Sequence, residues 1–142
     1  MSIRKYFIGS FYVKDLGKKL TLFRYGYGLG QDVDTIDHYN GMKYTVPYYN
    51  FSVKDDQGVD YMCVGYYTLN DENWLTNVYV EEWCRHLHIA TMVLRFFITN
   101  FKIKKLFVYS DNEYAIKLYH NLGFKDQETV SNDGHTFIIM SR

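Results

Sequence analysis

The chain has 142 residues, of which 47% are hydrophobic and 23% charged, a composition that fits a globular protein and excludes a disordered one. Lys and Arg together number 16, as do Asp and Glu, so the formal net charge is zero and lacks the basic excess usual in duplex nucleic-acid binders. Two cysteines are too few for a disulfide scaffold, and the early apolar run YFIGSFYV is too short to span a bilayer. The sequence therefore predicts a single domain, residues 1–142, in a reducing, cytoplasmic compartment and without a membrane partner.

The N-terminal third contains one candidate strand. Residues 4–13, RKYFIGSFYV, are rich in β-branched and aromatic side chains and predict it. Residues 14–47 show no two clear amphipathic helices. Within them, RYGYGLGQDVD carries glycines at 26, 28 and 30 but lacks the second half of a dinucleotide fingerprint and the lysine of a phosphate loop. We expect a plain loop there.

Three β segments follow. Residues 48–69, YYNFSVKDDQGVDYMCVGYYTL, predict a hairpin whose turn is Asp56-Gln57-Gly58. Residues 74–80, WLTNVYV, predict a third strand with Thr76, Val78 and Val80 on one face. Because the links between these strands are short, we expect them to be sequential antiparallel neighbours.

A largely apolar helix is expected next. In residues 89–101, IATMVLRFFITNF, the polar positions Thr91, Arg95 and Thr99 form one stripe, which indicates a helix buried against a sheet. The strand KKLFVYS follows it. A strand, a helix and a strand in this order predict a parallel pair with a right-handed crossover.

A second helix begins near residue 111. Ser110 and Glu113 have the spacing of a capping box, and Gly123 is placed as a left-handed C-cap with Phe124 beside it. The apolar stripe of this helix comprises Ala115, Leu118, Tyr119 and Leu122. A turn, NDG, then leads into a last strand, HTFIIMSR. Together these elements predict an α+β (mixed α/β) domain with helices packed on a sheet.

The segment VYVEEWCRHLHIA joins a strand to a helix and raises the question of a metal site. Cys84, His86 and His88 are two residues apart, so they point in nearly opposite directions on a helix and stand too far apart on a strand. No CxxC or HxxxH spacing occurs, and the other histidines, His38, His120 and His135, are scattered. We expect no metal here.

An anion site is the alternative for this segment. The first N–H groups of a helix lack internal partners and bind phosphates, and Arg85 adds a fork-shaped cation. The basic residues of the C-terminal half leave two interpretations open, a solvated surface or a modest patch for a phosphorylated ligand. These residues are Arg85, Arg95, Lys102, Lys104, Lys105, Lys117 and Lys125.

Two segments resemble the GNAT superfamily of N-acetyltransferases. In the first, Arg85, Ile89 and Ala90 match the acetyl-CoA-binding signature, with Val80 at the usual spacing before them. The second is DNEYAIKLYHNLGF, where Asn112, Ala115, Leu118, Tyr119, Leu122, Gly123 and Phe124 match. VGYYTL (64–69) is similar to the preceding strand, so the resemblance covers residues 50–142. The central glycine of the signature is replaced by His88, which keeps the N–H donor but adds bulk.

The resemblance implies a GNAT-like central mixed, mostly antiparallel sheet with a strand–helix–strand crossover and helices packed on both faces. Residues 1–50 would be a divergent acceptor-side region and residues 50–142 the cofactor-binding core. Acetyl-CoA would be the co-substrate, with no metal, and its acetyl group would pass to a primary amine by direct attack.

The resemblance also implies site residues. Val78, Tyr79 and Val80 would line the pantetheine arm, and Asn112 would contact the cofactor. Tyr119 would contact the cofactor as well and act as general acid. The pyrophosphate would lie on Arg85, His86, Leu87, His88, Ile89, Ala90 and Thr91. Helix spacing alone favours a core role for Tyr119, and both roles are compatible because a buried ring can present its hydroxyl at a cleft.

Several alternatives stay open at the level of sequence. Glu81 and Glu82 are candidates for the general base, directly or through water, and are equally plausible as solvated charges. The acceptor could be a small amine, a protein amine or an aminoacyl-tRNA, and a homodimer is open. A second hypothesis is a catalytically inactive GNAT-like binding or inhibitory module, motivated by His88 and the unusual N-terminal third.

Overall fold

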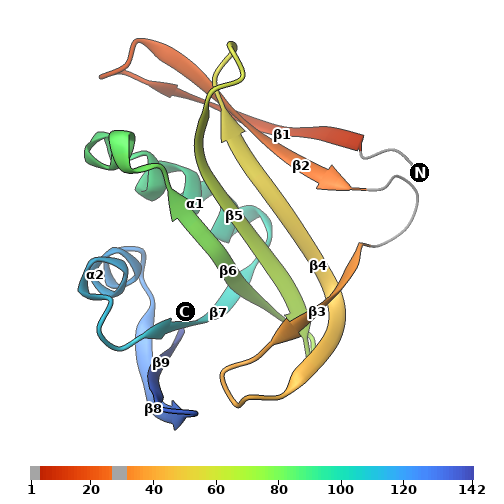
Figure 1. Ribbon diagram of the computed structural model, residues 1–142. Coiled ribbons are helices and arrows are strands. Elements are labelled where there is room, and N and C mark those ends of the chain that lie inside the picture. The colour runs from red at the N-terminus through yellow and green to blue at the C-terminus, as the bar shows by residue number, and fades with distance from the viewer. Residues whose placement is uncertain (1–3, 27–31) are drawn as a thin grey trace.

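The computed structural model of the protein describes residues 4–26 and 32–142 as one highly curved sheet with helices against it (Figure 1). The strands are β1 (Arg4–Val13), β2 (Lys18–Gly26), β3 (Val33–Asp37), β4 (Lys43–Lys54), β5 (Asp60–Leu69), β6 (Glu72–Val80), β7 (Ile103–Tyr109), β8 (Lys125–Asn132) and β9 (His135–Ser141). The helices are the 3₁₀ helix η1 (Glu82–Leu87), α1 (Ile89–Asn100) and α2 (Glu113–Asn121). The strand order is β1-β2-β4-β5-β6-β7-β9-β8, and β3 pairs with β4 beside this path.

The expected first strand, the hairpin and the third strand are confirmed as β1, β4–β5 and β6, and β4, β5 and β6 are antiparallel neighbours. Strands β2, β3 and β8 were not predicted. Strand β8 is exposed along nearly its whole length, so it lacks the alternation that marks a half-buried strand. Of the glycine-rich segment expected as a loop, Gly26 ends β2, whereas Gly28 and Gly30 lie outside the described residues.

Strands β6 and β7 are the expected parallel pair, but they separate soon after they begin. Only Asn73 pairs with Ile103 and Trp74 with Lys105. Beyond this contact β6 runs towards η1 and β7 runs towards α2 (Figure 1). Among residues 4–26 and 32–142, the edge of β6 that faces β7 therefore has no strand partner from Leu75 onward.

Strand β6 also contains a β-bulge. Cys63 is paired with Tyr79 but Gly65 with Thr76, so Asn77 and Val78 both lie opposite Val64. Asn77 has the left-handed φ of 53° that such an extra residue often requires. The expected common face of Thr76, Val78 and Val80 is therefore broken.

The side chains of β6 follow the bulge. Leu75 and Val80 are buried in the same hydrophobic cluster, with Val78 packed partly against it, whereas Thr76 is only half-buried. A bulge shifts the alternation of side chains by one residue, so the period of two that predicted the face holds only on each side of Asn77.

The N-terminus of α2 differs from the expected capping box. Ser110 donates its backbone N–H to Thr136 O at 2.9 Å and so extends the β7–β9 ladder. The cap is Asn112, whose Oδ1 accepts the N–H of Ala115 at 3.2 Å. The C-terminus is as expected: Gly123 has a φ of 95°, and the Phe124 N–H donates to Tyr119 O at 3.0 Å in a Schellman motif.

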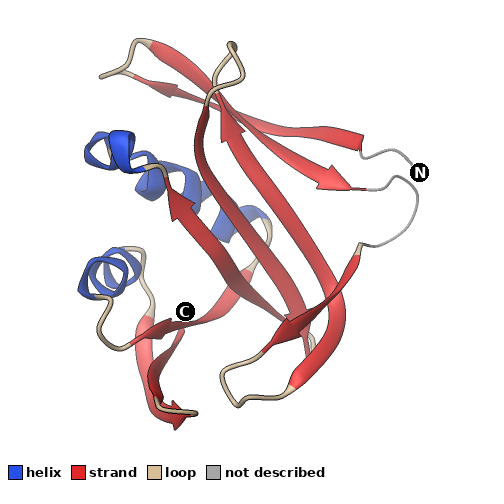
Figure 2. Ribbon diagram, in the orientation of Figure 1, coloured by secondary structure: helices blue, strands red, loops and turns tan. Residues whose placement is uncertain are grey.

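Two hydrophobic clusters lie on the two faces of the sheet. The larger contains the buried residues of α1, with Val93, Leu94 and Phe97, and Tyr119 of α2. The smaller contains strand residues, among them Tyr67 and Trp74. The mixed, mostly antiparallel sheet with a strand–helix–strand crossover is thus confirmed, and the helices of the described chain gather together (Figure 2). The second face is covered by β3 and its connection to β4 instead of by a helix, because the N-terminal third folds as strands. No helix among residues 4–26 and 32–142 is long and apolar enough to cross a membrane.

Candidate active site

Two pockets meet where β6 and β7 part. The larger one, which we call the cleft pocket, has a volume of about 580 Å³ and is lined by residues of β6, β7 and the β8–β9 hairpin. The second, the helix pocket, has a volume of about 340 Å³ and lies between the end of β6 and α2. Val78 and Tyr119 line both pockets. The parting of the sheet therefore gives two compartments with a common wall.

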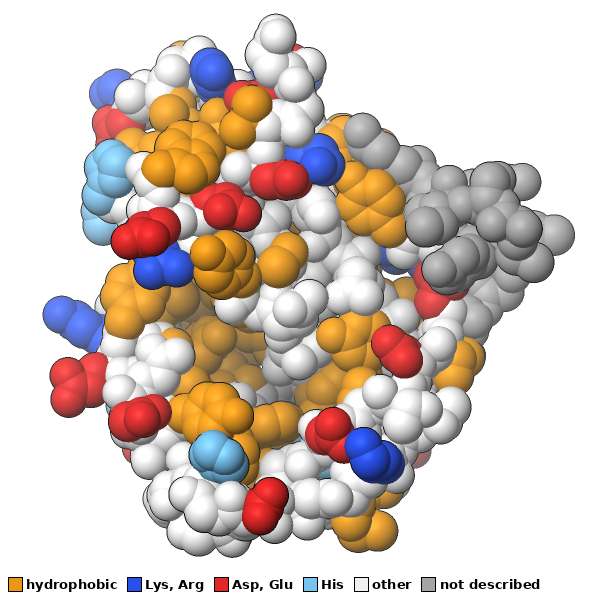
Figure 3. All heavy atoms as spheres, viewed as in Figure 1, with side chains coloured by type: hydrophobic (Ala, Val, Ile, Leu, Met, Phe, Trp, Pro, Cys, Tyr) orange, Lys and Arg blue, Asp and Glu red, His pale blue; other side chains and the backbone are white. Residues whose placement is uncertain are grey.

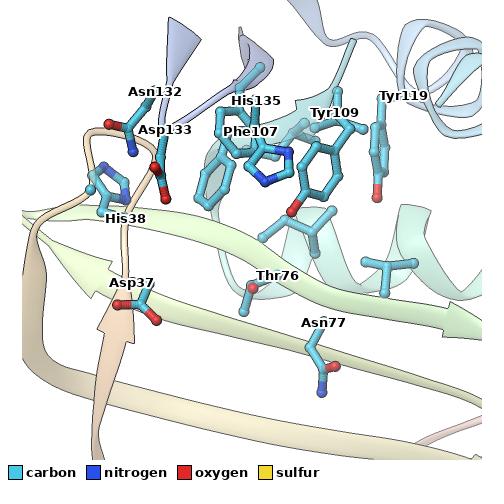
Figure 4. A pocket seen from close by; sticks show the side chains of 16 residues that line it. Asp37, His38, Thr76, Asn77, Phe107, Tyr109, Tyr119, Asn132, Asp133 and His135 are labelled. Carbon is cyan, nitrogen blue, oxygen red and sulfur yellow. The ribbon is translucent and has the colours of Figure 1, made fainter. Parts of the chain in front are cut away.

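The cleft pocket opens on the face shown in Figure 3, where the surface is hollowed and its floor is hydrophobic. Leu75, Leu106 and Phe107 contribute to that floor. In the close view of Figure 4, Tyr119 and Tyr109 lie at one end of the pocket, and Asp37, His38, Asn132 and Asp133 lie at the other.

The helix pocket brings together most of the residues that the family resemblance assigns to the pantetheine arm. Its lining comprises Val78, Tyr79, Val80, Arg85, Asn112, Tyr114, Ala115, Leu118 and Tyr119. Arg85 donates from Nε to Val80 O at 3.0 Å, and its guanidinium carbon lies 5.5 Å from the centre of the Tyr79 ring. These two contacts hold a permanent cation at the end of β6.

The surroundings of Tyr119 are compatible with both roles that the sequence left open. Its side chain belongs to the larger hydrophobic cluster and is 8% exposed, with its ring packed edge-on against Phe124 at an interplanar angle of 72°. Burial raises the pKa of the Tyr119 phenol to about 12. The hydroxyl points into the cleft pocket (Figure 4), so it is a protonated donor at the boundary of the two compartments.

Residues His86 to Thr91 line neither pocket and form the turn from η1 into α1. His88, which replaces the glycine of the signature, has φ 58° and ψ 25° and precedes the first residue of α1. This left-handed conformation is easy for glycine and unfavourable for histidine. No side chain in the described part of the chain caps α1, so no side-chain acceptor competes with an anion for its first N–H groups.

Glu81 and Glu82, the candidate bases, line neither pocket; Glu81 precedes η1 and Glu82 starts it. Cys84 is buried, its thiol lies 3.4 Å from Tyr61 O, and burial raises its pKa, so it is held as a thiol. Within the described ranges, no three His, Cys, Asp or Glu side chains are grouped to hold a metal ion.

Several residues at the cleft pocket were not singled out from the sequence as site residues. They are Asp37, Thr76, Asn77, Tyr109, Asn132 and Asp133, together with His38 and His135, which the sequence analysis considered only as scattered metal ligands. Asp37 and His38 fall in the N-terminal stretch that showed no readable pattern. Asn77 occupies the bulge, and nothing in WLTNVYV indicates an extra residue there.

The chain is similar to known acetyltransferases. Residues 50–138 match the family model of the acetyltransferase (GNAT) domain. No curated protein matches the sequence significantly. A GnaT-family acetyltransferase from Bordetella pertussis has a similar structure, with a TM-score of 0.56, 14% identity and coverage of 68% of this chain and 65% of that one.

Two further solved structures have the same fold. The ribosomal-protein-S18-alanine N-acetyltransferase from Escherichia coli gives a TM-score of 0.54 at 24% identity, over 66% of each chain. Spermidine N-acetyltransferase from Vibrio cholerae, in complex with CoA and spermine, gives 0.54 at 16% identity, over 66% of this chain and 63% of that one. The chain thus spans just under two thirds of the length of these structures, and at such identities the likeness is one of fold. Because the family model covers well over half of the sequence and the fold agrees with it, the chain belongs to the acetyltransferase (GNAT) domain family.

Proposed function

We propose that the protein is an acetyl-CoA-dependent N-acetyltransferase that moves the acetyl group to a primary amine by direct attack. The observation that carries this proposal is the pair of pockets with Val78 and Tyr119 as their common wall. One compartment suits a thioester arm and the other suits the amine, so the two reactants would meet beside the Tyr119 hydroxyl.

The helix pocket fits the pantetheine arm. An extended arm carrying amide groups can pair with the free edge of β6, as an added strand would, through backbone groups of Val78, Tyr79 and Val80. The left-handed Asn77 disturbs the ladder at the junction of the pockets, and an N–H freed there would polarise the thioester carbonyl. Asn112 would contact the arm from the start of α2.

The pyrophosphate would lie at the turn from Arg85 to Thr91. Arg85 supplies a positive charge beside the helix pocket, and the uncapped first turn of α1 supplies backbone N–H donors. His88 keeps its own N–H donor in the position of the signature glycine.

Tyr119 would protonate the departing thiolate. The amine nitrogen forms a bond to the thioester carbon, the carbon–sulfur bond breaks, and the proton lost by the nitrogen balances the one gained by the sulfur. A thiol has a pKa near ~8.5, so a phenol with a raised pKa gives up its proton to a thiolate only at a cost of several kcal/mol. Transfer is favourable when the phenol oxygen regains a proton from the ammonium of the adduct as it loses its own. We therefore assign Tyr119 the role of a proton relay whose phenol gains one proton as it loses another and so stays uncharged.

A primary amine is an ammonium at neutral pH, and we propose that water in the cleft pocket takes its first proton before the attack, because Glu81 and Glu82 line neither pocket. The second proton, which the adduct loses, is the one that passes through Tyr119 to the sulfur. A base acts within hydrogen-bond reach of the amine or through an intervening water. The two carboxylates would reach the amine only through such a chain of waters.

The same arrangement supports a division of the chain into two functional regions. We propose that residues 50–142 carry the cofactor-binding core and that residues 1–50 complete the acceptor side, within one domain. Residues of β3 and of its connection to β4 contribute Asp37, His38 and Gly41 to the cleft pocket, which supports the acceptor-side role.

Calorimetric titration with acetyl-CoA and a thiol-release assay test the proposal. We expect binding in the micromolar range and release of thiol with at least one primary amine. No binding at millimolar acetyl-CoA would refute the enzyme. Binding without thiol release across a panel of amines would favour the alternative, an inactive binding or inhibitory module.

Tyr119→Phe tests the relay. The ring and its packing are kept while the hydroxyl is lost, so turnover should fall on the order of 10²-fold with little change in acetyl-CoA affinity. Tyr12→Phe, at an exposed position of β1, is the control that removes a hydroxyl elsewhere. Equal turnover in the two variants would remove Tyr119 from its role.

A further inference from the structure

The charged residues of the cleft pocket are all acidic. Asp37, at the end of β3, and Asp133, in the β8–β9 turn, line it, and no Lys or Arg of the described chain does. Figure 4 shows both carboxylates at the end of the pocket away from Tyr119. A ligand that extends from Tyr119 to this end would lie along the hydrophobic floor of the pocket and would place its far end between two negative charges.

A histidine faces the same end. His38 is 7% exposed, and its Nδ1 shares a hydrogen bond of 2.8 Å with the Tyr67 hydroxyl. Its other ring nitrogen has no hydrogen-bond partner among the described residues. That nitrogen is not an enclosed, unsatisfied atom, so it is reached from the pocket that His38 lines. A buried side chain with a free polar atom turned into a cavity points to a ligand atom that pairs with it.

The ring of His38 is uncharged at neutral pH. Burial, with a further contribution from the charge of Lys105, lowers its pKa to about 4. A neutral imidazole does not repel a cation, and its free nitrogen accepts a hydrogen bond when Nδ1 carries the proton that bonds Tyr67. His38 therefore adds no positive charge to the carboxylate end of the pocket at neutral pH.

We infer that the cleft pocket selects amines that carry a second positive charge, such as α,ω-diamines and polyamines. The reacting nitrogen would lie beside Tyr119, the methylene chain along Leu75, Leu106 and Phe107, and the distal ammonium between Asp37 and Asp133 next to the free nitrogen of His38. This inference rests on the proposed acetyl transfer and adds to it the class of acceptor.

Lys43 is a competitor for one of the carboxylates. Its Nζ lies 2.8 Å from Asp37 Oδ1, with side chains 72% and 75% exposed respectively. Exposed pairs of this kind contribute little to stability, so a bound ammonium can take the place of Lys43 at small cost. Removing Lys43 should consequently strengthen the binding of a dication, whereas removing the carboxylates should weaken it.

The test compares 1,4-diaminobutane with butylamine, which has the same chain and lacks the second charge. We expect kcat/KM for the diamine to exceed that for butylamine by roughly tenfold or more, mainly through KM. The double variant Asp37→Asn/Asp133→Asn should remove that preference by lowering kcat/KM for the diamine to near the value for butylamine in the same variant. Lys43→Gln should raise the preference. Asp15→Asn, in the β1–β2 turn, removes one carboxylate charge outside the two pockets and is the control. It should leave the ratio of kcat/KM for 1,4-diaminobutane to that for butylamine unchanged.

A binding measurement separates this inference from the proposed function. Titration of the two amines into the CoA-saturated protein, followed by amide chemical shifts, reports affinity without turnover. Thiol release with equal kcat/KM for the two amines, unchanged in the double variant, would overturn the inference and leave acetyl transfer standing. If neither amine is acetylated, an affinity for 1,4-diaminobutane that depends on Asp37 and Asp133 would support the dication site, and equal affinities would refute it.

Discussion

At the scale of single residues, His88 combines a strained backbone conformation with a position in the proposed pyrophosphate site. It takes a left-handed conformation with φ 58° where the family signature has glycine, so its Cβ adds strain and stands near the expected pyrophosphate position. Lys102, just after α1, has a similar φ of 51° but lies outside the proposed site. Both residues therefore have a strained left-handed backbone, but only His88 lies in the proposed pyrophosphate site.

His88→Gly should therefore change two quantities and Lys102→Gly only one. Each variant removes the backbone strain of a side chain in the left-handed region, and this gain is partly offset because glycine gives the unfolded chain more conformational entropy. The free energy of unfolding should therefore stay unchanged or rise by up to about 1 kcal/mol in each variant. Only His88→Gly should also keep or tighten acetyl-CoA binding. Denaturant unfolding and calorimetric titration measure these changes. A large loss of affinity in His88→Gly alone would show that the imidazole itself contacts the ligand.

At the scale of elements, the bulged segment of β6 depends on a glycine in the neighbouring strand. Gly65 of β5 is paired with both Asn50 of β4 and Thr76 of β6. A Cβ at this position would lie 2.9 Å from Tyr49 O and 3.2 Å from Asn50 Oδ1. The backbone oxygen belongs to β4 and cannot move away without disturbing the β4–β5 ladder, which adjoins the bulged β5–β6 ladder.

Gly65→Ala should destabilise the protein by about 1–3 kcal/mol and weaken acetyl-CoA binding, because the strand that lines both pockets would shift. Gly9→Ala is the control at a second glycine beside a register shift, in the β1–β2 ladder. Its Cβ would meet only the end of the Phe96 ring, at 3.0 Å, and a side chain can turn away. Thermal unfolding should rank Gly65→Ala well below Gly9→Ala, and equal melting temperatures would show that β4 and β5 adjust freely.

The elements also show what a sequence can and cannot predict. The hairpin of β4 and β5, helix α1 and the C-cap at Gly123 were predicted because each depends on local pattern or turn chemistry. The predicted N-cap at Ser110 is wrong because the backbone N–H of Ser110 pairs with Thr136 O and continues the strand. Strand β8 was missed because it is a mostly exposed edge strand. Local rules fail where long-range pairing decides.

The candidate site divides in the same way. Arg85, Asn112 and Tyr119 were found through their fixed spacing in two short segments, and all three line the helix pocket. The far end of the cleft pocket is built from Asp37, in β3, and Asp133, in the β8–β9 turn, almost a hundred positions apart. Only the order of strands in the sheet brings such residues together, and no spacing rule contains it.

At the scale of the whole molecule, buried groups that titrate couple stability to pH. His38 is neutral in the folded protein down to its pKa of about 4, whereas in the unfolded chain it takes up a proton below about 6.5. The unfolded state then binds more protons, so stability falls as the pH drops from about 6.5 to 4 and is constant, for this group, above 6.5.

This loss should be on the order of 3 kcal/mol for His38. Urea unfolding at pH 7.5, 6.5, 5.5 and 4.5 measures it. In His38→Gln the slope over this range should largely disappear, even though the variant is less stable at pH 7.5 because a buried hydrogen bond to Tyr67 is altered. The same slope in both proteins would assign the effect to other groups.

Asp55 contributes in a separate, lower range of pH. Burial by itself would raise the pKa of the Asp55 carboxyl, but hydrogen bonds from the Val59 N–H, the Tyr61 hydroxyl, the Gln57 N–H and Lys18 together lower it. Its stabilisation is therefore present above the unfolded pKa near ~3.9 and is lost below it as the pH falls through the folded pKa.

The wall that Val78 and Tyr119 form between the two pockets has a consequence for inhibition. A conjugate that joins the nitrogen of a diamine to the sulfur of CoA through a short acyl bridge would occupy both compartments as one molecule. It would lose translational and rotational freedom once instead of twice, so its affinity should exceed that of either half by far more than a sum of contacts suggests. The parting of β6 and β7 thus makes this fold a natural target for bivalent ligands whose linker is only a few atoms long.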